Sequence, residues 1–501
     1  MPPTPTPTLV LALLLALPAA AQERAREEEL FGAPPPAEGA PATAGTAAGP
    51  PAAEAAVRAE LARTDDPLQI GGTFYLRGVV QAQEGTQPGH WPLSVPSLVD
   101  LFVDARPNDR VRAFGLLRSF YDPTLASPGA ASRLQGPSQV GTTAAGATLK
   151  SVLDQLWIKF DAGRTVFFTA GRQHVKWGVG RFWSPTDFLH AARRNPLATF
   201  DDRTGTTMLK AQLPFERQGA NLYAMAVAEP LVTRSPLVAA TGAPATTDQV
   251  GAVGGGARAE VVLGSWELGV DGVAQRGMRP RLGLDFSTGF WEVDLRGELA
   301  VRRGADQPRL RDVGTGGAHA YRLDAPGDVR TAAVANAEWR HKYSDEDAFT
   351  LGVEYFWNQD GYADPHLYLP VLAAGLATPF YLGRHYAGAW LVLPRPGGWN
   401  LHTFTLSGLG NLSDGSFVAR LDWSVTLLTY LTFEAFLAGH LGARGGEFRF
   451  GLDGAPLTAT VPPALYGVCA GLGTRAGGSC TIALPVATPL VDAGVALRVS
   501  L

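Results

Sequence analysis

The chain has 501 residues, a formal net charge of -4, 46% hydrophobic residues and only 18% charged residues. A soluble domain carries about 25% charged residues, so this chain is unusually poor in charge. No apolar run after residue 20 approaches the roughly 20 residues that a membrane helix needs. Low charge without such a run is typical of a transmembrane β-barrel, whose strands interleave apolar and polar residues. A long soluble β-protein remains the alternative on composition alone.

The N-terminal part divides into two segments. Residues 9–17 form a short apolar core that ends before Pro18 and three alanines, and this pattern predicts a secretory signal peptide over residues 1–21. No Lys or Arg precedes the core, which departs from the usual pattern. Residues 22–67 are rich in Ala, Pro, Gly and Glu, so we expect a disordered periplasmic linker. A plain linker is the simpler interpretation, and a tether to a periplasmic partner is the alternative.

Residues 68–501 show alternation of apolar and polar residues over stretches of about ten, the length that a tilted strand needs to cross a bilayer. In residues 290–302, Leu295 and Leu299 fall on one face, and Glu298 and Arg302 on the other. Similar stretches are residues 99–105, 266–271, 281–286, 333–340, 417–425 and 491–501. Full charges are costly in a dry core between two sheets but not against a water-filled lumen.

The links between these stretches alternate in length. The short ones include residues 107–110, 162–164, 214–217, 288–289 and 344–346, and the long ones are residues 84–96, 122–149, 177–205, 229–254, 303–329, 358–380 and 442–490. Outer-membrane barrels have short periplasmic turns and long extracellular loops. We therefore predict an all-β fold, a transmembrane antiparallel up-and-down β-barrel of about 18 strands, with 16 as the alternative. It would span residues 68–501 in a bacterial outer membrane, with both termini periplasmic.

The third long link and the strand before it, residues 171–205, combine glycines, aromatic residues and charges. A barrel of 16 or more strands encloses an aqueous channel, so we expect this stretch to fold inward and narrow it. The predicted constriction consists of Arg172, His174, Lys176, Arg181, Asp187, Arg193, Arg194, Asp201, Asp202 and Arg203. Lys and Arg outnumber Asp in this set, and rings of Arg and Lys favour anions. Alternatively, the Arg–Asp pairs only fasten the link to the wall, and the two roles are compatible.

The same stretch carries a resemblance. Gly171-Arg172-Gln173, then Trp177-Gly178, then Ser184-Pro185-x-Asp187 resembles the GRQ…WG…P-x-D segment of several porin-like outer-membrane families. It is similar, more distantly, to 18-stranded alginate-export-type barrels. The resemblance implies passive transport and a constriction at Arg172, Arg181 and Asp187.

The two cysteines, Cys469 and Cys480, both fall in the last long link. In an exported protein such a pair predicts a disulfide, and with no histidine nearby a metal site there is the weaker alternative. The chain contains neither G-x-S-x-G nor H-E-x-x-H, and no histidine cluster with metal-ligand spacing. We therefore expect no enzyme activity, no metal and no cofactor.

These patterns favour an outer-membrane channel for passive or facilitated passage of small hydrophilic solutes, with a preference for anions. Residues 177–205 would form its constriction. The alternative is a non-transporting barrel that acts in adhesion or assembly through its long extracellular loops. The expected partners are outer-membrane lipid and the solute, with no nucleic acid. A homo-oligomer is left open.

Overall fold

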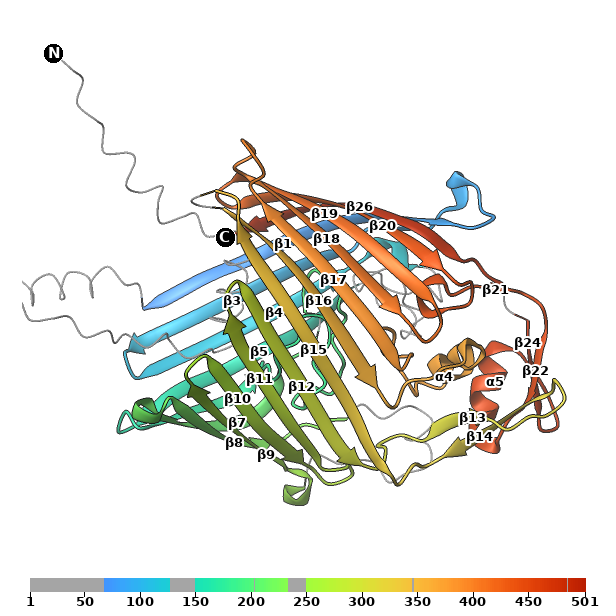
Figure 1. Cartoon of the computed structure of the whole chain (residues 1–501), viewed down its shortest axis with the longest axis horizontal. Helices are drawn as coiled ribbons and strands as arrows, with labels where there is room; N and C mark the ends of the chain where they lie inside the picture. The colour runs from blue at the N-terminus through green and yellow to red at the C-terminus, as the bar shows by residue number, and fades with distance from the viewer. Residues whose placement is uncertain (1–66, 127–148, 202, 233–248, 345–346, 484) are drawn as a thin grey trace, which may run out of the picture.

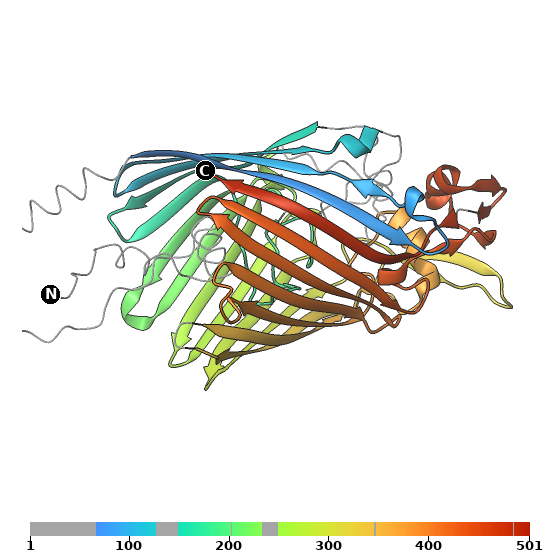
Figure 2. The ribbon, with the colours of Figure 1, turned by 90° about the horizontal axis from the view of Figure 1, so that it is seen from above.

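The computed structural model describes residues 67–126, 149–201, 203–232, 249–344, 347–483 and 485–501. Its main body is one sheet closed on itself, since β1 (Leu68–Gln83) pairs with both β3 (Ser97–Asn108) and β26 (Pro489–Ser500). The sheet has 19 strands, one of which is the two-residue β2 (Leu93–Ser94) beside β1. The other 18 form a closed antiparallel barrel (Figures 1 and 2), which confirms the predicted fold class and strand number.

The remaining barrel strands follow in chain order, each paired antiparallel with its neighbours. They are β4 (Val111–Tyr121), β5 (Leu149–Ala162), β6 (Val166–Gln173), β7 (Thr206–Phe215), β8 (Ala220–Val227), β9 (Gly254–Leu263), β10 (Trp266–Ala274), β11 (Arg281–Phe290), β12 (Val293–Arg303), β15 (Val329–Lys342), β16 (Ala348–Asn358), β17 (His385–Pro394), β18 (His402–Asn411), β19 (Ser416–Leu428) and β20 (Leu431–Gly442). The predicted signal peptide and nearly all of the predicted linker lie outside the described residues.

The links alternate as the sequence predicts. One end of the barrel carries the short links 109–110, 163–165, 216–219, 264–265, 291–292, 343–347, 395–401 and 429–430. The other end carries the long links 84–96, 122–148, 174–205, 228–253, 304–328, 359–384 and 443–488, together with the shorter 275–280 and 412–415. The last strand ends among the short links, where Figure 1 marks the C-terminus.

One predicted turn is misplaced. The sequence suggests a link at residues 288–289, but β11 continues to Phe290 and the turn consists of Trp291 and Glu292. Trp291 has a φ of 57° and is 94% exposed, so it is a turn residue and not the first residue of the next strand. The pairing of β11 with β12 continues through Gly289 and Phe290, which makes the strand longer than the sequence predicts.

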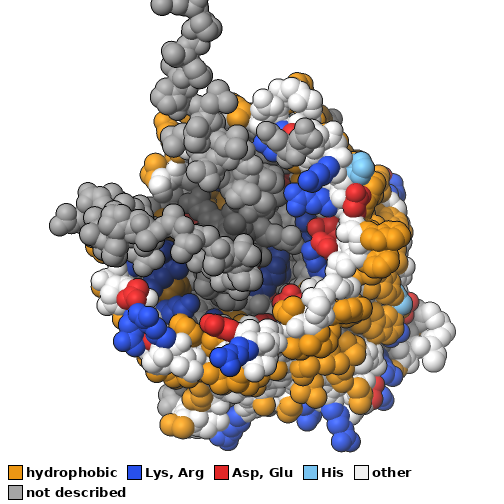
Figure 3. All heavy atoms as spheres, turned by 60° about the vertical axis from the view of Figure 1, so that its left-hand side comes forward, with side chains coloured by type: hydrophobic (Ala, Val, Ile, Leu, Met, Phe, Trp, Pro, Cys, Tyr) orange, Lys and Arg blue, Asp and Glu red, His pale blue; other side chains and the backbone are white. Residues whose placement is uncertain are grey.

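The two faces of the barrel wall differ sharply in polarity. On β12, Leu299 faces outward with 37% of its surface exposed, whereas the neighbouring Glu298 faces the lumen and is 4% exposed. Figure 3 shows hydrophobic side chains over the outer wall and charged side chains around a hollow end. The exposed outward-facing residues include Leu101, Leu117, Ile158, Leu209, Val270, Leu284, Leu351, Leu406, Leu437 and Val495. Such an apolar outer wall around a polar interior is typical of a barrel that faces lipid.

Three long links, residues 304–328, 359–384 and 443–488, fold together into a cap at their end of the barrel (Figure 1). Its regular elements are β13 (Arg309–Asp312), β14 (His319–Asp324), β21 (Leu452–Asp453), β22 (Leu457–Thr460), β23 (Thr474–Ala476), β24 (Ser479–Ile482), β25 (Pro485–Val486), α4 (Tyr368–Ala373) and α5 (Tyr466–Leu472). Tyr368, Leu310 and Leu465 lie in the buried cluster that joins the three links. The cap therefore has an apolar core of its own.

Short 3₁₀ turns complete the described chain: η2 (Pro88–His90), η3 (Pro123–Ala126), η4 (Glu216–Gln218), η5 (Val250–Ala252), η6 (Pro365–Leu367), η7 (Glu447–Arg449) and η8 (Pro463–Leu465). Among the described residues, no helix is both long enough and apolar enough to cross a membrane.

The predicted disulfide is present, and it joins Cys469 of α5 to Cys480 of β24 inside the cap core. With a sequence separation of 11, closing this loop stabilises the cap by about 2–3 kcal/mol in the loop-entropy estimate.

Replacing both cysteines with serine is expected to loosen the cap without unfolding the barrel, because the disulfide lies in the cap and no barrel strand contains it. Limited proteolysis within residues 443–488 should become at least about tenfold faster, while the heat-modifiable gel mobility of the barrel stays unchanged. Wild-type protein treated with a reductant should behave like the double variant. Equal cleavage rates in the oxidised, reduced and substituted proteins would contradict this assignment.

Candidate functional site

The link between β6 and β7, residues 174–205, crosses the interior of the barrel, and we call it the inserted segment. Arg420 on β19 donates a hydrogen bond to the carbonyl oxygen of Leu197 (3.0 Å), and Arg118 on β4 donates one to that of Asp201 (2.6 Å). Other contacts reach β12 and β16, on a different part of the wall. Because strands around the ring hold it, the inserted segment lies across the lumen, as the teal coil within the strands of Figure 2 shows.

Glu298 of β12 is the first anchor of the inserted segment. Its carboxylate accepts hydrogen bonds from the backbone N–H groups of Val179 (2.5 Å), Gly180 (2.6 Å) and Thr186 (3.2 Å), and from the Thr186 hydroxyl (2.8 Å). The approach requires glycine at position 178, where φ is +90° and a Cβ atom would lie 2.6 Å from Glu298 Oε1. The glycines of the W-G-V-G sequence thus let the backbone wrap around a buried carboxylate.

Glu354 of β16 is the second anchor. It accepts hydrogen bonds from the backbone N–H groups of Arg181 (2.6 Å), Phe182 (3.0 Å) and Trp183 (2.9 Å), and from the side-chain amide of Asn336 (2.9 Å). These backbone groups belong to no helix or strand, and without a partner each would cost free energy in the buried interior. Together, the two glutamates fix the backbone of residues 179–186.

Aromatic side chains of the inserted segment pack against the wall beside these anchors. Trp183 is fully buried, stacks on Phe356 with 5.5 Å between ring centroids, and donates its indole N–H to the carbonyl oxygen of Phe380 (3.1 Å). Phe182 contacts Trp390 edge to face at 5.4 Å. Farther along, Phe200 packs edge to face on Tyr75 of β1 at 4.8 Å. These rings hold the segment in place and are not exposed surfaces for a solute.

Three of the predicted site residues, His174, Asp187 and Arg203, join one buried polar chain. His174 Nε2 lies 3.0 Å from Asp154 of β5, and its Nδ1 lies 3.3 Å from His190 Nε2. His190 Nδ1 in turn lies 2.9 Å from Asp187, which accepts a hydrogen bond from Arg203 at 2.7 Å. The chain therefore links the start of the inserted segment to its end and ties both to β5.

Asp201 extends this chain through Arg203 at 2.6 Å. Burial alone would raise the pKa values of Asp187 and Asp201, but His190 and Arg203 hold the pKa of Asp187, and Arg203 that of Asp201, well below the usual range. Both aspartates thus stay ionised and paired. Both pairs lie within the inserted segment and join its parts to one another, and the two carboxylates neutralise the charge of Arg203.

The remaining predicted cations lie differently. Arg193 is exposed, and its guanidinium lies 5.6 Å from the ring centroid of Tyr381, whose hydroxyl donates a hydrogen bond to the carbonyl oxygen of Arg194 (3.1 Å). Arg181 lies over the ring of Trp390 at 4.8 Å, and Lys176 is exposed. Of the described carboxylates, none forms an ion pair with Arg193 or Arg194.

Arg172 departs from the prediction. It pairs across the sheet with Leu156 and Thr207, and Leu156 is exposed on the outer wall. Because paired residues share a face, Arg172 also faces outward, where it forms an ion pair with Glu229 (3.0 Å). β6 ends at Gln173, so the alternation that would place residues 172, 174 and 176 on one face does not continue. Asp202 lies outside the described residues.

Arg193 and Arg194 line a cavity of about 630 Å³ between the inserted segment, the barrel wall and the cap. Its charged lining consists of eight cations and two carboxylates: Lys150, Arg193, Arg194, Arg203, Arg281, Arg302, Arg309 and Arg330, with Asp306 and Asp360. Asp360 pairs with Arg302 and Arg330, and Asp306 with Arg281. The cavity therefore carries a marked excess of positive charge.

Sequence reasoning missed the anchors and most of this cavity. Glu298 and Glu354 are recognisable as lumen-facing from alternation, but no local pattern indicates that they bind backbone amides more than 100 residues away. The cavity arginines at positions 281, 302 and 330 come from three barrel strands, and Arg309 comes from β13 in a cap link. Only the predicted inward fold of residues 171–205 pointed to a shared interior site.

No family model matches this chain, and no curated protein matches it. Among solved structures, a mutant of the Rhodopseudomonas blastica porin is similar over 87% of this chain and 100% of its own, with 10% identity and a TM-score of 0.38. Pseudomonas aeruginosa OpdK, solved with vanillate, is similar over 86% of this chain and 98% of its own, with 10% identity and a TM-score of 0.46. At these scores the likeness carries no inference about solute or mechanism. The resemblance at residues 171–187 stays a prediction.

Replacing Glu354 with alanine should free the inserted segment, because three buried N–H groups lose their acceptor at about 1–3 kcal/mol each. Hydrogen exchange at Arg181, Phe182 and Trp183 should become at least about tenfold faster. Glu338→Ala is the matched control, since Glu338 is also a buried lumen-facing glutamate. Its ion-pair partner is Arg296 on the neighbouring barrel strand (3.9 Å), which is not part of the inserted segment. Equal protection in the wild type and both variants would contradict the anchoring role.

Proposed function

We propose that the protein is an outer-membrane channel through which small hydrophilic solutes diffuse, with a preference for anions. The closed barrel, its apolar outer wall and its charged interior support membrane embedding with a polar lumen. Because outer-membrane barrels have their short turns on the periplasmic side, the short links and both termini would face the periplasm, and the cap would face the exterior. The predicted signal peptide and periplasmic linker fit the same route of export.

The excess of Lys and Arg around the 630 Å³ cavity is the observation that carries the preference for anions. A cleft lined by one sign of charge, with walls of low dielectric constant, raises the local concentration of ions of the opposite sign. Rings of Arg and Lys select anions in other pores for this reason. An anion that enters past the cap would therefore meet a favourable potential before it reaches the inserted segment.

Arg193 and Arg194 are the residues most suited to set this preference. Arg281, Arg302 and Arg330 each have a carboxylate within ion-pair distance, which cancels much of their field at short range. Arg193 and Arg194 lie on the inserted segment itself and line the cavity without such a partner among the described residues. The sequence analysis predicted this anion-selecting role for ten residues, of which Arg193 and Arg194 are two.

A non-transporting barrel is the second candidate function, and the cap favours it. The three long links pack on a buried apolar core with a disulfide, so they form a fixed surface at one end of the barrel. A fixed outer surface suits adhesion or assembly as well as it suits control of entry. The two functions differ in whether ions pass through the lumen.

Single-channel current in a planar bilayer, with reversal potential in a salt gradient, separates them. The channel predicts discrete current steps with an anion-selective reversal potential. Arg193→Ala/Arg194→Ala should move that potential toward zero, because two cations that face the cavity are lost.

The control is Arg110→Ala/Arg164→Ala, which removes two cations at the short-link end, where they pair with Asp161 and Asp109. It should leave the selectivity close to that of the wild type. Current steps with no change of selectivity in the first variant would remove the assignment of Arg193 and Arg194. Absence of any current from folded protein would favour the non-transporting barrel.

A further inference from the structure

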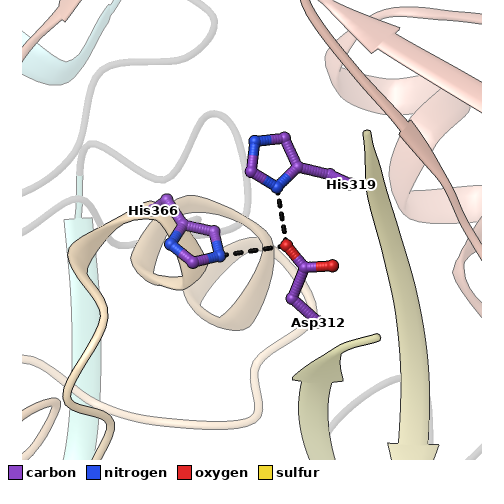
Figure 4. A group of neighbouring side chains, drawn as sticks. All are labelled: Asp312, His319 and His366. Atoms are coloured by element: carbon purple, nitrogen blue, oxygen red, sulfur yellow. Dashed lines mark hydrogen bonds and ion pairs between the residues drawn. The ribbon is translucent and has the colours of Figure 1, made fainter. Parts of the chain in front are cut away.

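The cap brings together two histidines and an aspartate from distant positions. Asp312 ends β13, His319 begins β14, and His366 lies in η6 of the next cap link. Asp312 Oδ2 lies 2.6 Å from His319 Nδ1 and 3.2 Å from His366 Nε2. Figure 4 shows both imidazole rings turned toward this one oxygen atom. One donor atom from each residue lies within 4.8 Å of the other two.

The Asp312 carboxylate is held in an orientation that suits a ligand. Its Oδ1 accepts hydrogen bonds from the backbone N–H groups of Gly314 (2.9 Å) and Ala320 (3.0 Å), which leaves Oδ2 to face the histidines. Hydrogen bonds of this kind orient the carboxylate ligands of metal sites.

The backbone on both sides of the cluster is fixed by the cap core. Leu310, two residues before Asp312, and Leu367, next to His366, are both buried in that core. The backbone N–H of Leu310 also donates a hydrogen bond to the Tyr362 hydroxyl (3.2 Å), which joins the two links directly. The three side chains therefore meet because two packed links place them together, and not through a chance contact of free loops.

Arginines close to the cluster in the sequence form ion pairs with carboxylates outside the cluster. Arg311 and Arg322 both pair with Asp324, at 3.0 Å and 2.8 Å, and Arg309 lies 3.6 Å from Asp360. The cluster itself is open to water, because the side chains of Asp312, His319 and His366 are 18%, 32% and 36% exposed. Solvent can thus supply further ligands.

We propose that Asp312, His319 and His366 bind a divalent transition-metal ion of the Zn²⁺ class. Imidazole nitrogen and carboxylate oxygen suit Zn²⁺, Cu²⁺ and Ni²⁺, whereas Ca²⁺ and Mg²⁺ prefer sites made only of oxygen. With metal–ligand distances of about 2.0–2.2 Å, donor atoms in a tetrahedral site lie roughly 3.3 Å apart. Asp312 Oδ2 and His366 Nε2 are already 3.2 Å apart, and small side-chain movements bring His319 Nδ1 into range.

A bound ion would join the links 304–328 and 359–384, since Asp312 and His319 belong to the first and His366 to the second. Both links line the cationic cavity. The metal would therefore restrain the part of the cap through which a solute enters, although metal binding itself does not depend on the channel function. No sequence motif indicates this site, because its ligands lie 7 and 54 residues from Asp312.

The test is isothermal titration of Zn²⁺ into the purified full chain in detergent, without a histidine tag. We expect one saturable site in the wild type. His319→Ala and His366→Ala should each weaken binding at least about tenfold, since loss of even a supporting partner costs 10–100-fold. His90→Ala is the matched control, because His90 is exposed on another long link, and it should bind as the wild type does.

Electron paramagnetic resonance of the Cu²⁺-loaded protein gives a second readout. The wild type should show splitting from two imidazole nitrogens, and each of the two cluster variants should show one. Heat-modifiable gel mobility identifies variants that have kept the barrel. No saturable Zn²⁺ binding to the folded wild type, or equal binding by the wild type and both cluster variants, would overturn the proposal.

Discussion

The arrangement of the lumen depends on two buried carboxylates that bind backbone N–H groups. An irregular segment can lie inside a barrel only if its N–H and C=O groups find partners there. Glu298 and Glu354 provide acceptors for six backbone N–H groups of the inserted segment. The glycines at positions 178 and 180 let the chain come close enough, and Trp183 closes the contact against the wall. With the backbone fixed in this way, the polar chain from His174 to Asp201 can form and Arg193 is directed to the cavity.

Charge has two separate uses inside this barrel. Asp187, Asp201 and Arg203 are buried and form ion pairs with one another, and these pairs stabilise the inserted segment. Arg193 and Arg194 line the same cavity as Arg203 but form no ion pair with a described carboxylate. The same division holds in the cap, where Asp324 and Asp360 pair with arginines while Asp312 faces two histidines. Residue type alone does not separate these uses, because burial and the nearest partner decide between them.

The fold could be predicted because it depends on local pattern. Leu299 outside and Glu298 inside follow from alternation, and the fixed phase of long and short links follows from the architecture of a closed barrel. The disulfide followed from two cysteines in one link. The site was only partly predictable, because its contacts are long-range. Arg172 was assigned to the wrong face since β6 ends before His174, and neither the Glu298 anchor nor the Asp312 cluster leaves a local pattern.

We propose that the inserted segment sets the width of an open path through the lumen. Because Gln173 pairs with Thr206, residues 174–205 can be replaced by a short hairpin turn without moving the strands on either side. The most direct measurement is the size limit for neutral sugars in liposome swelling, compared between the wild type and this shortened barrel. We predict that both admit sugars and that the shortened barrel admits larger ones. The same size limit in both proteins would contradict the claim.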